Sequence, residues 1–238
     1  MTDLATTEHE DLMTLLGMIA AGEKRTALQT LAASPHLART AVTAGATRQN
    51  AASHFFPAIA HYAYAGDTPL HFAAATYQRD VAEALVDMGA DVRARNRRGA
   101  EPLHYAADGS PGRPSWTPEA QQAIIEFLIA IGADPNAPDK SDVAPLHRAV
   151  RTRSSAAVRA LLAGGADALR RNGSGSTPLH LAVQNTGAGG SGSDAARAEQ
   201  VQIIQILIEH GARPTDRDAG GRTARESARS EWVRTLLD

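Results

Sequence analysis

The sequence predicts an all-α fold: a solenoid of stacked helical hairpins joined by projecting β-turns, with additional helices at the N-terminus. Three observations lead to this expectation. A Pro-Leu-His motif recurs four times, a glycine follows the second apolar stretch of each copy, and the distance from that glycine to the next motif is constant. Repetition at a period of roughly 20–50 residues is typical of proteins in which each unit packs only against its neighbours.

The repeated motif sets the spacing of the hairpins. Its prolines are Pro69, Pro102, Pro145 and Pro178, and a degraded copy runs over 223–229. The glycines are Gly89, Gly132, Gly165 and Gly211, and each stands 13 residues before the next motif position. Successive motif positions are 33, 43, 33 and 46 residues apart, so the length variation lies inside the hairpins.

Local chemistry explains both helix ends. Threonine before proline favours a helix start, because the hydroxyl caps free amides and proline at the first position loses no hydrogen bond. Glu101 and Ala144 replace this threonine, so we expect weaker caps there. The glycines suit left-handed C-caps. An Asx residue six positions before motif positions 102, 145, 178 and 224 and a glycine three before the motif predict tight β-turns, with Asp142 in place of one glycine.

Residues 1–62 lack the motif and are predicted to form an N-terminal helical capping region. Apolar stretches at 12–21 and 27–33 flank Gly22-Glu23, which indicates a helical hairpin that ends at Pro35. A further helix is predicted over 47–64, restarting at Pro57.

A helix, a short turn, an antiparallel helix and a projecting β-turn within 33 residues resemble the ankyrin repeat, whose signature Thr-Pro-Leu-His-x-Ala occurs at 68–73 and 177–182. The resemblance covers 63–238. Its units are expected at 63–95, 96–138, 139–171 and 172–217, followed by a C-terminal cap at 218–238. It implies a non-enzymatic protein–protein interaction module, without a cofactor, that binds a protein partner in a concave groove.

In the ankyrin family the residue after Leu-His faces this groove. The resemblance therefore implies six partner contacts: Phe72, Tyr105, Arg148 and Leu181, with Asp108 and Arg151 one helical turn further on. Aromatic and arginine side chains would suit an acidic partner segment. The alternative is that Phe72 and Leu181 belong to the core and that Arg151 pairs with Asp108.

Arginines in the first projecting turn suggest an alternative function, the binding of an anionic ligand or nucleic acid. The candidate contacts are Arg95, Arg97 and Arg98. A formal net charge of −2 and the lack of interleaved aromatics argue against nucleic acid and favour a solvated face.

Two insertions separate the helices of their hairpins. Trp116, in the insertion over 108–118, is either a plug that folds the loop or an exposed contact at the insertion edge. The second insertion, 185–198, includes a Gly/Ser-rich run at 187–193. It lacks the lysine of a phosphate-binding loop and is expected to be flexible.

The remaining features argue against catalysis, metal and membrane. Motif histidines in stacked repeats lie roughly 10 Å apart, too far to share one metal ion, and the resemblance implies that they bond backbone in the neighbouring turn. The chain has no cysteine, which excludes disulfides and thiolate metal sites. No catalytic spacing and no run of about 20 apolar residues occurs. We therefore expect a soluble, cytoplasmic protein with no metal.

Overall fold

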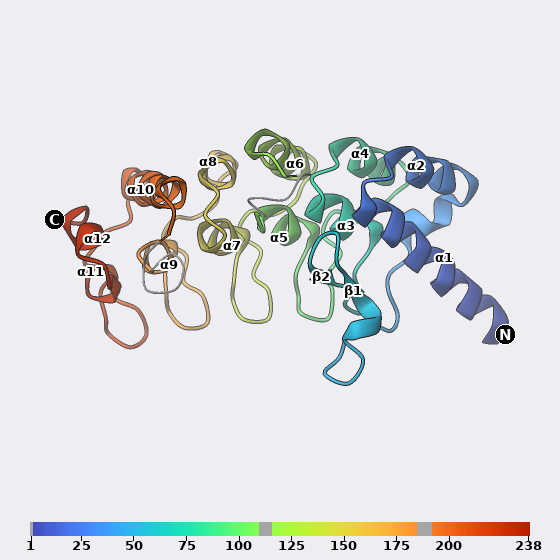
Figure 1. Ribbon diagram of the computed structural model, residues 1–238, viewed down its shortest axis with the longest axis horizontal. Coiled ribbons are helices and arrows are strands. Elements are labelled where there is room, and N and C mark those ends of the chain that lie inside the picture. The colour runs from blue at the N-terminus through green and yellow to red at the C-terminus, as the bar shows by residue number, and fades with distance from the viewer. Residues whose placement is uncertain (1, 110–115, 185–191) are drawn as a thin grey trace. The chain divides into compact units, whose positions relative to one another are not determined.

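The structure, a computed structural model, describes residues 2–109, 116–184 and 192–238. Its internal contacts divide the chain into two compact units. Unit 1 comprises residues 1–106 and 113–134, and unit 2 comprises residues 107–112 and 135–238. Helical hairpins build both units, as the repeated motif predicts (Figure 1).

Unit 1 contains three helical hairpins. They are α1 (Thr2–Ala21) with α2 (Lys24–Ala33), α3 (Pro69–Ala75) with α4 (Arg79–Asp87), and α5 (Pro102–Ala107) with α6 (Pro118–Ala130). Helix α1 packs against α2 and α3, whereas α4 packs against α2 and α6. Helices α1 and α3 therefore belong to an inner row, which α5 continues in Figure 1, and α2, α4 and α6 form an outer row. The predicted N-terminal hairpin is confirmed, and it occupies the place of a repeat.

The helix predicted over 47–64 is wrong. A short 3₁₀ helix, Ala52–His54, is followed by strands β1 (Phe55–Phe56) and β2 (His61–Tyr62). The strands pair antiparallel, with Phe55 opposite Tyr62 and Phe56 opposite His61. Aromatic residues favour such strands because their rings pack across a pleated surface. The deciding contacts are tertiary, so the periodicity of this short segment could not distinguish a strand from a helix.

Unit 2 repeats the same arrangement. It contains α7 (Pro145–Arg151) with α8 (Ser155–Ala163), α9 (Pro178–Ala182) with α10 (Asp194–Glu209), and α11 (Ala224–Ser227) with α12 (Glu231–Thr235). Helix α9 packs against α7 and α11, and α8 packs against α10. The last pair, α11 and α12, lies in the segment expected to form the C-terminal cap.

Four of the inner helices begin with the same imidazole bond. The backbone N–H of Thr68, Glu101, Ala144 or Thr177 donates to Nδ1 of the motif histidine three residues later, at 3.1–3.3 Å. Glu101 and Ala144 therefore lose only the threonine hydroxyl and keep the imidazole contribution to the cap. In α11 a glutamate performs this task, because its carboxylate accepts from the N–H of Thr223 at 2.7 Å.

The far nitrogen of the motif histidine reaches the next turn. Nε2 of His71 lies 3.2 Å from the carbonyl oxygen of Ala100, and Nε2 of His180 lies 3.1 Å from that of Arg222. Because Nδ1 accepts, Nε2 carries the proton and donates. The expected bond to backbone in the neighbouring turn is thus confirmed for both residues, and it holds each imidazole in a structural role.

The core and the turns also follow the motif. The motif leucines are at most 1% exposed: Leu70, Leu103, Leu146 and Leu179. Asp142 adopts a φ of 56°, as expected for a residue that replaces a turn glycine. Gly66 has a φ of 88°, and a Cβ there would lie 2.7 Å from Cα of Asn96 in the next turn. Neighbouring turns stack so closely that glycine is required at that position.

No helix within the described ranges is both long enough and apolar enough to cross a membrane.

Candidate binding surface of the inner helices

The residue after each Leu-His pair is the groove position, and its exposure differs between the two units. In unit 1 the groove positions hold Phe72 and Tyr105, whose exposed fractions are 0% and 2%. In unit 2 they hold Arg148, whose side chain is 11% exposed, and Leu181, which is half-buried. Ser227 has the same register in α11 and is also half-buried.

Tyr105 is held by a buried carboxylate. Its hydroxyl donates to Asp67, with distances of 2.9 and 3.0 Å to the two carboxylate oxygens. Nδ2 of Asn96 lies 2.8 Å from Oδ1 of Asp67 and 3.0 Å from the Tyr105 hydroxyl. Asp67 is 0% exposed, and charge-assisted bonds of this kind are stronger than neutral ones. The ring of Tyr105 is therefore fixed in position.

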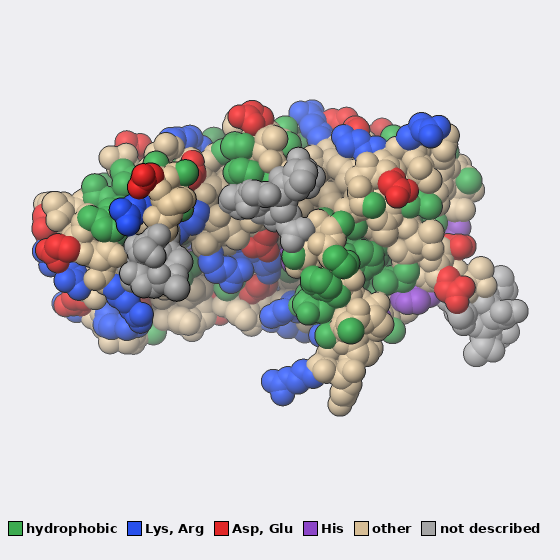
Figure 2. All heavy atoms as spheres, in the orientation of Figure 1, with side chains coloured by type: hydrophobic (Ala, Val, Ile, Leu, Met, Phe, Trp, Pro, Cys, Tyr) green, Lys and Arg blue, Asp and Glu red, His purple; other side chains and the backbone are tan. Residues whose placement is uncertain are grey.

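The β1–β2 hairpin packs against the groove positions of unit 1. The imidazole of His61 stacks on the ring of Tyr105 with centroids 4.7 Å apart, and Phe56 meets Phe72 edge-on at 4.8 Å. The opposite face of the hairpin carries Phe55 and Tyr62, which are 38% and 37% exposed. Figure 2 shows hydrophobic side chains gathered over this hairpin. The chain thus contacts its own predicted groove residues in unit 1.

In unit 2 the groove position of α7 holds a mostly buried arginine that pairs with two carboxylates. Nη1 of Arg148 lies 2.9 Å from Oδ2 of Asp108, and Nη2 lies 3.1 Å from Oδ2 of Asp139. Oδ1 of Asp139 accepts the backbone N–H groups of Ser141 and Val143, at 2.8 and 3.1 Å. Asp139 therefore shapes its turn with one oxygen and holds the arginine with the other.

The electrostatics of this cluster keep the pair ionised. Burial alone would lower the pKa of Arg148, but the carboxylates of Asp108 and Asp139 outweigh it and raise that pKa. Burial alone would also raise the pKa of Asp139, but the N–H groups of Ser141 and Val143, together with Arg148, hold that pKa below its usual 3.8. Both residues are consequently charged at neutral pH.

A nine-residue spacing underlies both arrangements. Asn96 and Tyr105 are nine residues apart, as are Asp139 and Arg148. The sequence predicted Asn96 and Asp139 only as turn residues and missed that they anchor the groove position. The signal was present, because each pair matches a donor to an acceptor at the same spacing.

Arg151 has a different environment from Arg148. Its Nη2 lies 3.6 Å from Oδ1 of Asp108, so the predicted pairing of these two residues is confirmed. The side chain of Arg151 is nevertheless 64% exposed. Nη1 and Nη2 of Arg148 are thus both engaged by carboxylates, whereas Arg151 retains an accessible guanidinium.

Comparisons with known proteins identify this repeat architecture. Family models described as ankyrin repeats in three copies, ankyrin repeats in many copies, and the single ankyrin repeat match the chain at 8–113, at 128–182, and at 98–140 with 174–219. The chain belongs to the ankyrin repeat family. No curated protein matches it. Ankyrin repeats are generally protein–protein interaction modules and are typically non-enzymatic.

The N-terminal hairpin of this ankyrin repeat protein falls within the first match. That match begins at residue 8 and therefore includes most of α1 and all of α2, although neither carries Pro-Leu-His. A boundary between a capping region and a repeat domain at residue 62 stays a prediction.

The arginines of the first projecting turn are largely engaged within the ankyrin unit. The guanidinium groups of Arg97 and Arg98 lie 5.2 and 5.1 Å from the ring centroid of Tyr64. Nη1 of Arg98 also bonds the Tyr64 hydroxyl at 2.9 Å, and Nε of Arg95 donates to the carbonyl of Gly99 at 3.1 Å. These contacts leave fewer guanidinium N–H donors in the turn for an anionic ligand.

Glu101 partly neutralises the positive charge of the same turn. Its carboxylate lies 4.0 Å from Nε of Arg93 and 3.8 Å from Nε of Arg95, and its side chain is 3% exposed. Burial raises the pKa of Glu101, and the two arginines only partly oppose this rise. The fold therefore buries the Glu101 carboxylate in an environment that disfavours its ionised form.

Trp116 is half-buried, and its indole N–H donates to Oε1 of Gln121 at 2.9 Å. That bond ties it to α6, and its role as an insertion-edge contact stays a prediction. Residues 110–115 of the first insertion and 185–191 of the second, which include most of the Gly/Ser-rich run, lie outside the described residues.

Across the parts of the chain that the structure describes, no three histidine, aspartate or glutamate side chains are grouped so that they could hold a metal ion.

Proposed function

We propose that this ankyrin repeat protein is a non-enzymatic binding module that presents the inner-helix surface of unit 2 to an acidic segment of a partner protein. The observation that carries the proposal is the exposure of Arg151, at 64%, beside the locked pair of Arg148 and Asp108. A surface whose side chains are already held by ion pairs is preorganised, so binding costs little ordering entropy.

The six predicted groove residues divide into three groups under this proposal. Arg151 and the half-buried Leu181 supply accessible contacts, whereas Asp108 and Arg148 form a rigid floor beside them. Phe72 and Tyr105 are buried, so they can touch a partner only if the β1–β2 hairpin moves. Their role as partner contacts stays a prediction.

The alternative, an anionic ligand or nucleic acid bound through Arg95, Arg97 and Arg98, is less well supported, because each guanidinium already has a neighbour within unit 1. Salt concentration separates the two proposals. Phosphate binding weakens steeply as salt rises, since bound counterions are released.

Partner capture from the source organism tests the proposal. Tagged full-length protein, Arg151→Glu and Arg197→Glu would be compared by affinity purification and mass spectrometry. Arg197 is exposed on the outer helix α10, so it provides the same charge change away from the surface. We expect Arg151→Glu alone to lose the partner while the far-UV circular dichroism of all three stays the same. Equal recovery with both variants would refute the proposed surface.

A further inference from the structure

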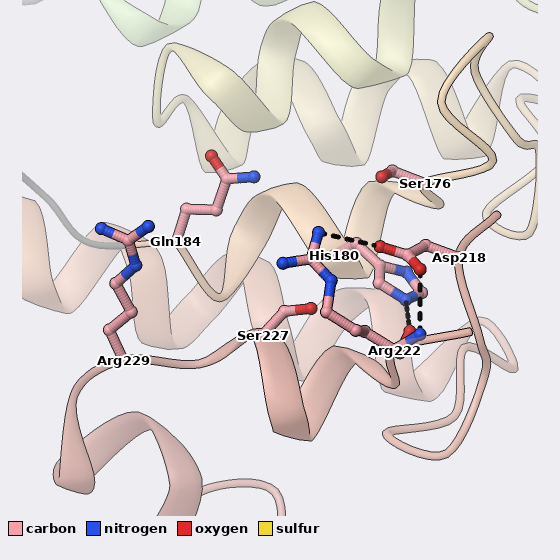
Figure 3. A pocket seen from close by; sticks show the side chains of 7 residues that line it. All are labelled: Ser176, His180, Gln184, Asp218, Arg222, Ser227 and Arg229. Carbon is pink, nitrogen blue, oxygen red and sulfur yellow. Dashed lines mark hydrogen bonds and ion pairs between the residues drawn. The ribbon is translucent and has the colours of Figure 1, made fainter. Parts of the chain in front are cut away.

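A pocket of about 310 Å³ lies in unit 2 between α9 and the C-terminal cap. Figure 3 shows Arg229 and Gln184 at one side of it and Arg222 with Asp218 at the other. Ser227, at the end of α11, lies between them. Among the described residues that line it, only His180 belongs to the ankyrin signature, and none is a predicted groove contact.

The surroundings of Arg148 show how the equivalent space is filled in α7. Its two carboxylate partners have fixed places in the repeat: Asp139 stands six residues before Pro145, and Asp108 stands six residues after Pro102 of the preceding repeat. The long arginine side chain spans the distance between them. The groove position of α7 is therefore closed by the chain itself.

The equivalent positions in the C-terminal cap are Asp218, six residues before Ala224, and Gln184, six residues after Pro178. The groove position there is Ser227, whose hydroxyl donates to the backbone carbonyl of Thr223. A serine is too short to span the space that an arginine fills in α7. The pocket is open because the cap carries a small residue at the groove position.

The charge of the pocket is positive. The carboxylate of Asp218 accepts the backbone N–H of Arg222 at 3.0 Å and its Nη2 at 3.3 Å, and these contacts lower the pKa of Asp218. Arg222 is 71% exposed and keeps donors to spare. Arg229 is exposed and has no ion pair or side-chain hydrogen bond to any residue that the structure describes. Two guanidinium groups thus face one carboxylate that is already satisfied.

We propose that this pocket receives an acidic side chain, aspartate or glutamate, of the partner segment, between Arg222 and Arg229. Guanidinium groups bind carboxylates through paired N–H donors, and the side-chain amide of Gln184 adds a further donor. The volume holds a carboxylate side chain and several waters, since each water occupies about 30 Å³. The occupant rests on the proposed function, whereas the pocket chemistry is tested without the partner.

A peptide probe tests the chemistry directly. Fluorescence anisotropy would follow a fluorescein-labelled 12-residue peptide of glycine, serine and four glutamates binding to the full chain. We expect Arg229→Gln to weaken binding about tenfold. Arg225→Gln is the matched control, because Arg225 belongs to the same helix pair and bonds Asp238 at 2.7 Å, and it does not line the pocket. It should bind as the unaltered chain does.

A filling variant separates the pocket from general electrostatic attraction. Ser227→Leu introduces the side chain that α9 carries at its groove position, and it leaves the charge unchanged. We expect this variant to lose the peptide while its circular dichroism and thermal midpoint match those of the unaltered chain. Arg222→Gln should also weaken binding, because it removes the second guanidinium.

Four results would overturn the inference. The first is that Arg229→Gln and Arg225→Gln weaken peptide binding equally, and the second is that Ser227→Leu binds the peptide as the unaltered chain does. The third is that a peptide with glutamine in place of glutamate binds equally well, and the fourth is that the unaltered chain does not bind the glutamate peptide. Partner capture distinguishes the two proposals. Loss with Arg151→Glu but not with Arg229→Gln leaves the proposed function standing and removes the pocket from it.

Discussion

In unit 1 the groove position of α5 holds Tyr105, whereas in unit 2 the groove position of α7 holds Arg148. Tyr105 bonds a buried carboxylate and carries the β1–β2 hairpin on its ring. Arg148 bridges two carboxylates and lies beside the exposed Arg151. One register of the ankyrin repeat thus supports a covered aromatic contact in one unit and a charged, accessible surface in the other.

The difference originates in the turn before each helix. Asn96 supplies an N–H donor for the Tyr105 hydroxyl, and Asp139 supplies an acceptor for the Arg148 guanidinium. Each side chain also shapes its own turn through Oδ1. A change at the groove position therefore requires a matching change nine residues earlier, and this coupling can be tested by breaking each pair.

The largest effect is expected in unit 2 from Asp139→Ala. This substitution leaves the mostly buried Arg148 with one carboxylate partner and removes the acceptor for two turn amides. Each hydrogen bond to a charged group contributes about 1.5–3 kcal/mol, and this substitution removes three of them. Urea unfolding of the full chain measures it, with the exposed Glu209→Ala as a control expected within about 0.5 kcal/mol. A loss below about 1 kcal/mol would contradict the dependence of Arg148 on Asp139.

A smaller effect is expected in unit 1 from Tyr105→Phe. The ring and its stacking on His61 remain, but Asp67 loses the hydroxyl donor. An under-satisfied buried group costs about 1–3 kcal/mol. Tyr62→Phe is the matched control, since Tyr62 lies on the exposed face of the hairpin. Equal unfolding free energies for the two variants would show that the Asp67 network does not fix Tyr105.

The sequence predicted features that depend on local chemistry. Helix starts, C-cap glycines and the left-handed Asp142 follow from neighbouring residues alone, and the structure confirms Asp142. The resemblance to ankyrin repeats implied the longer-range histidine bonds, which are confirmed for His71 and His180. The β1–β2 hairpin could not be predicted, because its aromatic residues are arranged by contacts with Phe72 and Tyr105. The same contacts decide which groove residues stay accessible. The sequence therefore predicted which residues occupy the groove positions but not which of them are exposed.

The smallest expected effect concerns two carboxylates, the buried Glu101 and the half-buried Asp139, whose pKa values shift in opposite directions. Burial raises the pKa of Glu101 in unit 1, so the folded state favours its protonated form and its ionised form is unfavourable at neutral pH. Asp139 in unit 2 has a lowered pKa, so its ionised form stabilises folding above about pH 3.8 and that contribution is lost in more acidic solution.

Glu101→Gln should therefore raise the unfolding free energy at pH 7, by less than about 1 kcal/mol because two weak arginine contacts are lost as well. The gain should shrink as the pH falls toward 4.5, where the unfolded glutamate takes up its proton. Asp139→Asn should instead lower stability at pH 7, and its cost should shrink below pH 3.8. Urea unfolding provides the measurement, at pH 7, 5.5 and 4 for Glu101→Gln and at pH 7, 4 and 3 for Asp139→Asn. A Glu101→Gln gain that is no larger at pH 7 than at pH 4 would mean that the arginines of the projecting turn fully offset the burial of this carboxylate.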